Sequence, residues 1–190
     1  GNDNIDGGAG NDTVTVDGLT EDDTIDGGDG VDTLIIGAAV AYDDEALPTA
    51  IDDAVNISGF EVVRGTAALT QDMAAFDGVV ALASAGGVFT ATEASAIGDF
   101  FALTNNTGLD ITLATDGAAD SINIHMGLDS AQSNSTGVTV DAIEIETALI
   151  ASLGLDGNTL TDFEADALTS LTVIGSKNLS VTLNDSAAVA

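Results

Sequence analysis

The sequence predicts an all-β protein built from short strands and tight turns. Two observations carry this prediction. Near the N-terminus, a pattern of about nine residues rich in glycine and aspartate recurs, and each copy ends at one large apolar residue. From Ile57 onward, Val, Ile, Thr and Leu alternate with small polar residues, and Gly, Asn or Asp turns recur about every ten residues.

Four segments carry the N-terminal pattern: residues 1–6, 7–15, 17–26 and 27–35. Their apolar anchors, spaced by 9, 11 and 9 residues, are Ile5, Val14, Ile25 and Leu34. The second and fourth segments match Gly-Gly-x-Gly-x-Asp-x-U-x in full, where U is a large apolar residue. The third is looser, because Leu19 and Thr20 stand where glycine is expected.

The chemistry of this pattern favours a calcium site. Glycine permits positive φ and close approach of two backbones, so the loops can point carbonyl oxygens inward. The aspartate adds a carboxylate, and Ca²⁺ takes about six to eight such oxygen ligands. A zinc site is excluded by the absence of Cys and the single His. The alternative, ordinary Gly/Asp/Asn turns, does not explain why the copies stay in register.

The segments resemble the calcium-binding nonapeptides of RTX proteins. The resemblance implies a right-handed parallel β-roll in which two nonapeptides form one turn, with Asp3 facing Asp23 and Asp12 facing Asp32. Two carboxylates about 5 Å apart repel by about 3 kcal/mol at an effective dielectric of about 20, so calcium binding and folding are expected to be one event. The ligands expected in this region are Gly1, Asp3, Gly7, Gly8, Ala9, Gly10, Asp12, Asp23, Gly27, Gly28, Asp29, Gly30 and Asp32.

Composition limits the possible partners. The chain has 190 residues, with 32 acidic against two basic residues, and a formal charge of −30, which opposes binding to nucleic acid and to anionic membranes. The apolar content of 45% nevertheless predicts a folded protein rather than disorder. Without Cys there are no disulfides, and no apolar run reaches the about 18 residues of a membrane span. The chain begins inside a repeat, so we expect it to be part of a longer polypeptide.

Three regions are expected: a calcium-binding β-roll over residues 1–36, a linker over 37–56 and a β-rich domain over 57–190. Within the linker, residues 43–56 are expected to form a loop or a short helix broken by Pro48, with solvated carboxylates rather than a second metal site. In the β-rich domain, residues 90–101 are expected to form a short helix. Strands are expected at 87–91, 109–114, 121–125, 138–140 and 171–174.

The β-rich domain contains weak internal similarity. Residues 57–62 resemble 140–145, and Leu-x-Val cores recur at Leu171 and Leu179. Stacked rungs of a β-solenoid explain this repetition, and a β-sandwich explains it nearly as well. Within the domain, Asp120 precedes x-Ile as the nonapeptide aspartates do, although Ala118 replaces a glycine. Asp120 is therefore either a ligand of a further calcium or the start of an Asx-turn.

The whole chain resembles the calcium-dependent surface-layer proteins of Gram-negative, chiefly alphaproteobacterial, cells. The resemblance is carried by the nonapeptides together with residues 56–63, 142–150 and 168–183 in a Thr/Ala/Val-rich β region. It implies type I secretion without an N-terminal signal, self-association into a two-dimensional lattice, and attachment to lipopolysaccharide through parts outside this chain. The four repeats seen here are fewer than in the usual array.

An inventory of catalytic motifs argues against an enzyme. The chain lacks His-Glu-x-x-His and Gly-x-Ser-x-Gly, and its one histidine, His125, is expected to be a strand residue. The glycine loops lack the lysine of phosphate-binding loops, and no carboxylate pair is singled out for glycoside hydrolysis. The sequence therefore predicts a secreted, extracellular structural protein of the bacterial cell surface. The alternatives are a segment of an RTX adhesin or biofilm-matrix protein, and the export and folding module of an RTX enzyme.

Overall fold

A computed structural model describes residues 3–16, 23–37, 57–73, 76, 78–95, 97–127 and 135–184. These residues contain seventeen β-strands and no α-helix, which confirms the all-β prediction. In the same residues, no helix has the length and apolarity needed to cross a membrane. The even-numbered strands are β2 (Thr13–Val16), β4 (Thr33–Ile36), β6 (Val62–Gly65), β8 (Ala81–Ser84), β10 (Asp99–Ala102), β12 (Ser121–Met126), β14 (Thr147–Ser152) and β16 (Ser170–Gly175). The odd-numbered strands are β1 (Asn4–Asp6), β3 (Thr24–Asp26), β5 (Ile57–Ser58), β7 (Leu69–Asp72), β9 (Gly87–Ala94), β11 (Thr107–Leu113), β13 (Val138–Asp141), β15 (Asn158–Glu164) and β17 (Leu179–Leu183).

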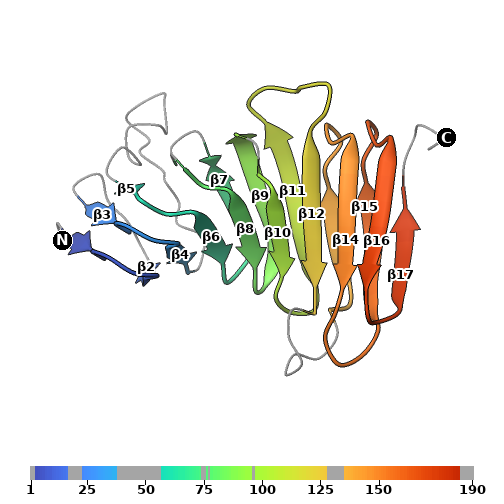
Figure 1. Ribbon diagram of the computed structural model, residues 1–190, viewed down its shortest axis with the longest axis horizontal. Coiled ribbons are helices and arrows are strands. Elements are labelled where there is room, and N and C mark those ends of the chain that lie inside the picture. The colour runs from blue at the N-terminus through green and yellow to red at the C-terminus, as the bar shows by residue number, and fades with distance from the viewer. Residues whose placement is uncertain are drawn as a thin grey trace.

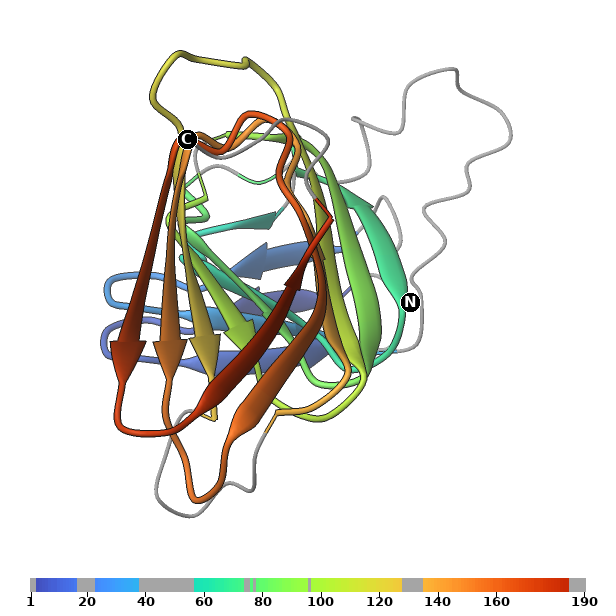
Figure 2. The same ribbon diagram turned by 90° about the vertical axis from the view of Figure 1, so that its right-hand side faces the viewer.

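The strands wind into a parallel β-solenoid. All even-numbered strands form one eight-stranded sheet, while β1, β3 and β5 form a three-stranded sheet and β7 to β17 a six-stranded sheet. Every strand pairing among the described residues is parallel, and successive strands of the chain lie in opposite sheets. Figure 1 shows the even-numbered strands side by side in chain order, and Figure 2 shows the two walls facing each other along the stack. The expected parallel roll is therefore present, and the β-rich region continues it as a solenoid rather than a sandwich.

The solenoid contains strands from both sides of the expected linker. Strand β3 pairs with β5 and β4 pairs with β6, so strands on both sides of residues 37–56 belong to the same sheets. The loop or helix expected at 43–56 lies outside the described residues. All five expected strands coincide with observed ones, namely β9, β11, β12, β13 and β16.

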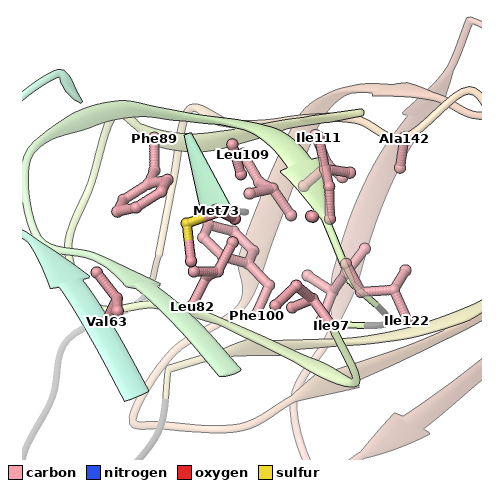
Figure 3. Close-up of a cluster of buried hydrophobic side chains, with 14 of the residues drawn as sticks. Val63, Met73, Leu82, Phe89, Ile97, Phe100, Leu109, Ile111, Ile122 and Ala142 are labelled. Atoms are coloured by element: carbon pink, nitrogen blue, oxygen red, sulfur yellow. The ribbon is translucent and has the colours of Figure 1, made fainter. Parts of the chain in front are cut away.

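The core is a set of aliphatic and aromatic ladders between the two walls. On the eight-stranded sheet, one in-register row is fully buried and consists of Leu34, Val63, Leu82, Phe100, Ile124 and Ile150. The facing row of the six-stranded sheet consists of Leu69, Phe89, Leu109, Val140 and Phe163. Figure 3 shows side chains of the two rows meeting in the interior. Each such side chain contributes about 1.5–3 kcal/mol by leaving water, which makes the ladder the main stabilising element.

The short helix expected at residues 90–101 is wrong. Residues 90–94 belong to β9 and residues 99–101 to β10, and Phe89 and Ala91 point into the core in strand alternation. The pairing of β9 with β11 shifts register after Ala91, and Glu93 there has a positive φ of 51°. Such a bulge inserts an extra residue and disturbs the alternation. Because the alternation of apolar and polar residues is interrupted there, the sequence of this strand resembles that of a helix.

Candidate calcium site

The turns that lead from each odd-numbered strand to the next even-numbered strand stack along one side of the solenoid, called here the acidic edge. It includes residues 7–12, 27–32, 59–61, 114–120 and 142–146. The N–H of Thr33 donates to the carbonyl of Asp12 at 2.9 Å, and the N–H of Val62 donates to the carbonyl of Asp32 at 3.1 Å. Asp12, Asp32 and Glu61 therefore occupy the same position in three successive turns.

These three residues form a column, in which the carboxylate of one residue accepts a hydrogen bond from the backbone of the residue one turn earlier. Oδ1 of Asp32 accepts the N–H of Asp12 at 2.7 Å, and Oε2 of Glu61 accepts the N–H of Asp32 at 2.7 Å. On the opposite edge, Oδ1 of Asp23 accepts the N–H of Asp3 at 2.8 Å. Both expected aspartate pairs are thus brought together. Each carboxylate satisfies the backbone of the preceding turn, which a strand-end N–H needs when it is removed from water.

Two carboxylate oxygens in this column lack a protein partner. Oδ2 of Asp12 and Oδ2 of Asp32 are buried and have no hydrogen-bond partner among the described residues, and Asp32 is 0% exposed. A buried carboxylate is costly unless it is paired or coordinates a metal. The described residues show no salt bridge from Arg64 to Asp32 or Glu61. The unsatisfied oxygens therefore point to a cation as the partner.

Several glycines of these loops are packed too closely against the next turn to carry a side chain. A Cβ added to Gly7 would lie 2.3 Å from the carbonyl oxygen of Gly27, and one added to Gly28 would lie 2.0 Å from that of Gly8. Gly28 also has a φ of +95°, which L side chains avoid. Ala9 and Asp29 meet as a parallel bridge, with the N–H of Asp29 donating to the Gly8 carbonyl at 2.7 Å.

Two further residues expected as ligands, Gly10 and Gly30, lie at the same contact between the loops. The N–H of Gly10 donates to the carbonyl of Asp29 at 2.9 Å. The Cα of Gly30 lies against the carbonyl of Gly10, where an added Cβ would clash. The loops at 7–12 and 27–32 therefore stack as expected. Gly1 lies outside the described residues.

A second acidic cluster lies further along the acidic edge. One carboxylate oxygen from each of Asp116, Asp120 and Glu146 lies within 4.8 Å of the other two. Oε2 of Glu146 accepts the N–H of Asp120 at 2.7 Å, as Glu61 does for Asp32. Oδ2 of Asp120 also accepts the N–H of Gly117 at 2.6 Å, so this carboxylate closes its own turn as well. This contact differs from the expected Asx-turn, because it runs back to Gly117 and not forward to the N–H two residues later. The neighbouring carboxylates of Asp116 and Glu146 leave the ligand role of Asp120 as a prediction.

Sequence reasoning missed Glu61, Asp116 and Glu146. A usable signal exists for the two glutamates, because each stands two residues before an apolar strand residue that belongs to the core or packs against it, as Asp12 and Asp32 do. Glu61 precedes Val63 in this way, and Glu146 precedes Ala148. An acidic residue two positions before an apolar strand residue is thus typical of the column. The sequence comparison of residues 57–62 with 140–145 had instead aligned Glu61 with Glu144. Asp116 has no such signal.

The two walls of the solenoid differ sharply in charge. Among the eight even-numbered strands, all of them described, Asp99 is the only acidic residue, and it contacts His125 with Oδ1 and Nε2 2.6 Å apart. His125 lies on β12, as expected, and its ring stacks on Phe101 with centroids 4.6 Å apart. The six-stranded sheet carries six acidic residues: Asp72, Glu93, Asp110, Asp141, Asp162 and Glu164.

Three of these acids form an in-register row on the outer face, with Asp141 paired between Asp110 and Glu164. Burial, followed by repulsion from Asp110 and Glu164, raises the pKa of Asp141 above its usual 3.8. Repulsion of this kind is expected when like charges stand directly opposite each other on neighbouring strands. Negative charge is therefore concentrated on one wall and along the acidic edge.

The donors gathered on the acidic edge are carboxylate and carbonyl oxygens. Hard oxygen ligands on flexible loops suit Ca²⁺ better than Mg²⁺, which demands near-octahedral geometry, and better than softer metals. Comparison of the chain with protein-family models, with curated proteins and with solved structures gave no match.

Proposed function

We propose that this protein is a calcium-stabilised, non-enzymatic structural protein of the bacterial cell exterior and forms part of a self-assembling surface layer. The observation that carries the calcium assignment is the fully buried carboxylate of Asp32, whose Oδ2 has no partner between stacked glycine loops. Calcium supplies a multidentate partner for such oxygens and offsets the repulsion between successive turns. Because the loops that would form the site are separate in the unfolded chain, binding energy becomes folding energy.

A structural role for calcium follows from where the carboxylates lie. They occupy the turns that join one strand to the next and link each turn of the solenoid to its neighbour. Ions held there would stiffen the stack and remove part of its charge of −30. The cluster of Asp116, Asp120 and Glu146 is a second candidate position on the same edge. The absence of Cys makes such ions the natural substitute for disulfides in an extracellular protein.

Self-association is supported by the unequal charge of the two walls. A highly acidic chain can contact its own copies closely only where carboxylates are sparse or bridged. The outer face of the eight-stranded sheet meets this condition, because its one acid, Asp99, already contacts His125. That face also carries Arg64 and the half-buried apolar side chains of Ile35, Phe101 and Leu149. Attachment to lipopolysaccharide and type I secretion are proposed from the resemblance to surface-layer proteins.

The decisive experiment compares the chain in calcium, in magnesium at equal ionic strength, and in chelator. Far-ultraviolet circular dichroism should show β-structure gained on adding calcium after chelation, with a much weaker response to magnesium. Electron microscopy should show ordered two-dimensional arrays only in calcium. Identical spectra in calcium and chelator would refute the calcium assignment. Monomers that persist in calcium at high protein concentration, but bind cells or glycans, would favour the adhesin.

A further inference from the structure

We propose that Glu61 completes a second cation site, one turn beyond the glycine-rich repeats, so that Asp32 serves two ions. This inference rests on the calcium-binding function proposed above. It concerns a turn that carries no nonapeptide, since residues 59–61 read Gly-Phe-Glu. The acidic edge would then hold one ion between loops 7–12 and 27–32, and another between loop 27–32 and the turn at 59–61.

The turn at 59–61 docks on loop 27–32 in the same way that this loop docks on 7–12. The N–H of Gly27 donates to the carbonyl of Ser58 at 3.0 Å, as the N–H of Gly7 donates to that of Asp26 at 2.8 Å. A Cβ on Gly27 would lie 2.1 Å from the carbonyl oxygen of Gly59, closely matching the 2.3 Å from Gly7 to the Gly27 carbonyl. The two interfaces between turns therefore share one backbone hydrogen bond and one equally close glycine contact.

In two successive turns, a buried carboxylate oxygen has no hydrogen-bond partner among the described residues. Oδ1 of Asp32 is committed to the N–H of Asp12, while its Oδ2 is buried without a partner on a residue that is 0% exposed. Oδ2 of Asp12 is likewise buried and unpartnered in the preceding turn. One ion between the first two loops would leave the interface between Asp32 and Glu61 with two carboxylates and no positive charge. Within the described residues, Arg64 forms no salt bridge with either of them.

Glu61 is placed to supply the missing ligand. Its Oε2 lies 2.7 Å from the backbone N of Asp32, which holds the carboxylate at the interface between the two turns. The same arrangement recurs where Glu146 accepts the N–H of Asp120 at 2.7 Å, so glutamate can take the aspartate position without changing the hydrogen bond. That later pair has no buried, unpartnered oxygen among the described residues, and the inference is therefore confined to Glu61 and Asp32.

The test is calorimetric titration of the full chain with calcium, using Glu61→Gln, Asp12→Asn and the double variant. Glutamine keeps an oxygen that can accept the Asp32 N–H but removes the charge. We expect Glu61→Gln and Asp12→Asn each to lose one bound calcium, and the double variant to lose two. Glu144→Gln is the matched control, because Glu144 also accepts a backbone N–H, that of Leu113 at 2.7 Å, but lies outside the column. It should bind as the parent does.

The outcomes separate this inference from the function on which it rests. A parent chain that binds no calcium would refute the proposed function. A parent that binds calcium with the same stoichiometry and affinity as Glu61→Gln would refute only the role of Glu61. If Glu61→Gln does not fold in saturating calcium, Glu61→Asp provides the measurement. Its shorter carboxylate should keep the stoichiometry but weaken one site by about tenfold, and an unchanged titration would overturn the inference.

Discussion

The backbone N–H of Asp12 donates to Oδ1 of Asp32 at 2.7 Å, one turn further along the solenoid, while Oδ2 of Asp32 stays buried without a partner. The two oxygens of this carboxylate therefore have separate tasks. One satisfies the neighbouring backbone and is needed in any folded state. The other has no partner among the described residues. If it binds the proposed cation, the packing of successive turns is linked directly to metal binding.

Substitution of Asp32 should separate these two tasks. Asp32→Asn keeps an acceptor for the Asp12 N–H but loses the charge, so calcium affinity should fall sharply with little loss of stability in chelator. Asp32→Ala leaves that N–H unsatisfied and should cost a further about 1–3 kcal/mol. Urea unfolding in chelator and calcium titration measure the two effects. Asp29→Asn is the control, because the exposed Asp29 contributes to the loop contact through its carbonyl and N–H. Equal stability of the two Asp32 variants would contradict the division of tasks.

Calcium affinities should couple within the expected aspartate pairs and not between them. If Asp12 and Asp32 share one ion, the double change Asp12→Ala/Asp32→Ala should weaken that site little more than either single change, because one lost ligand already cripples it. Asp12→Ala/Asp23→Ala combines residues of opposite edges and should show additive losses. Calorimetric titration of the three single variants, including Asp23→Ala, and of the two double variants decides the question. Additive losses within the pair would show that these loops do not share an ion.

Replacement of Gly28 should be far more damaging than replacement of Gly78. Both have positive φ, +95° and +89°, so each Ala variant pays about 1–2 kcal/mol of backbone strain. Only at Gly28 would the new Cβ meet a backbone carbonyl, 2.0 Å away on Gly8, whereas a Cβ on Gly78 meets nothing within 4 Å. Denaturation in saturating calcium should therefore separate the two variants. Similar losses would mean that the two loops are not in close contact.

Asp141→Asn should stabilise the protein at neutral pH. Burial and then Asp110 and Glu164 raise the pKa of Asp141 in the folded state, so the ionised carboxylate opposes folding above that pKa. This destabilisation disappears as pH falls below the ordinary value of 3.8, where both states carry the proton. Removal of the charge should add about 0.5 kcal/mol at pH 7. Urea unfolding across pH in constant calcium tests the sign. The control Asp156→Asn, in an exposed turn, should leave the profile unchanged.

A charge placed on the outer face of the eight-stranded sheet should block assembly. Leu149→Glu adds a carboxylate to the wall that holds only Asp99, so calcium-bound chains should stay dispersed while retaining their circular dichroism. Thr112→Glu adds the same charge to the exposed face of β11 on the acidic wall and should assemble as the parent does. Electron microscopy and sedimentation give the readout. Arrays formed by Leu149→Glu would show that copies meet elsewhere.

Local features of this protein could be predicted from its sequence. The glycine positions, the aspartates two residues before each apolar anchor and most strands depend on turn chemistry and on alternation with a period of two, which neighbouring residues determine. For that reason the strand position of His125 was anticipated correctly. The stacking of Asp12 with Asp32 was anticipated from the resemblance to the RTX repeats. The alternation misled at residues 90–101, where a bulge at Glu93 breaks the period.

The alignment between turns was decided only by the tertiary structure. Partners in the sheet lie 20 residues apart from Val14 to Leu34 but 29 apart from Leu34 to Val63, since the loops between strands differ in length. Without a constant repeat, the sequence could not show that Glu61 stands beside Asp32, or Glu146 beside Asp120. Nor could it show that nearly all strand carboxylates fall on one wall. Those relationships arise because inward-facing ladders such as Leu82, Phe100 and Ile124 bury their side chains only when the turns are in register, and that register carries the acidic residues into line.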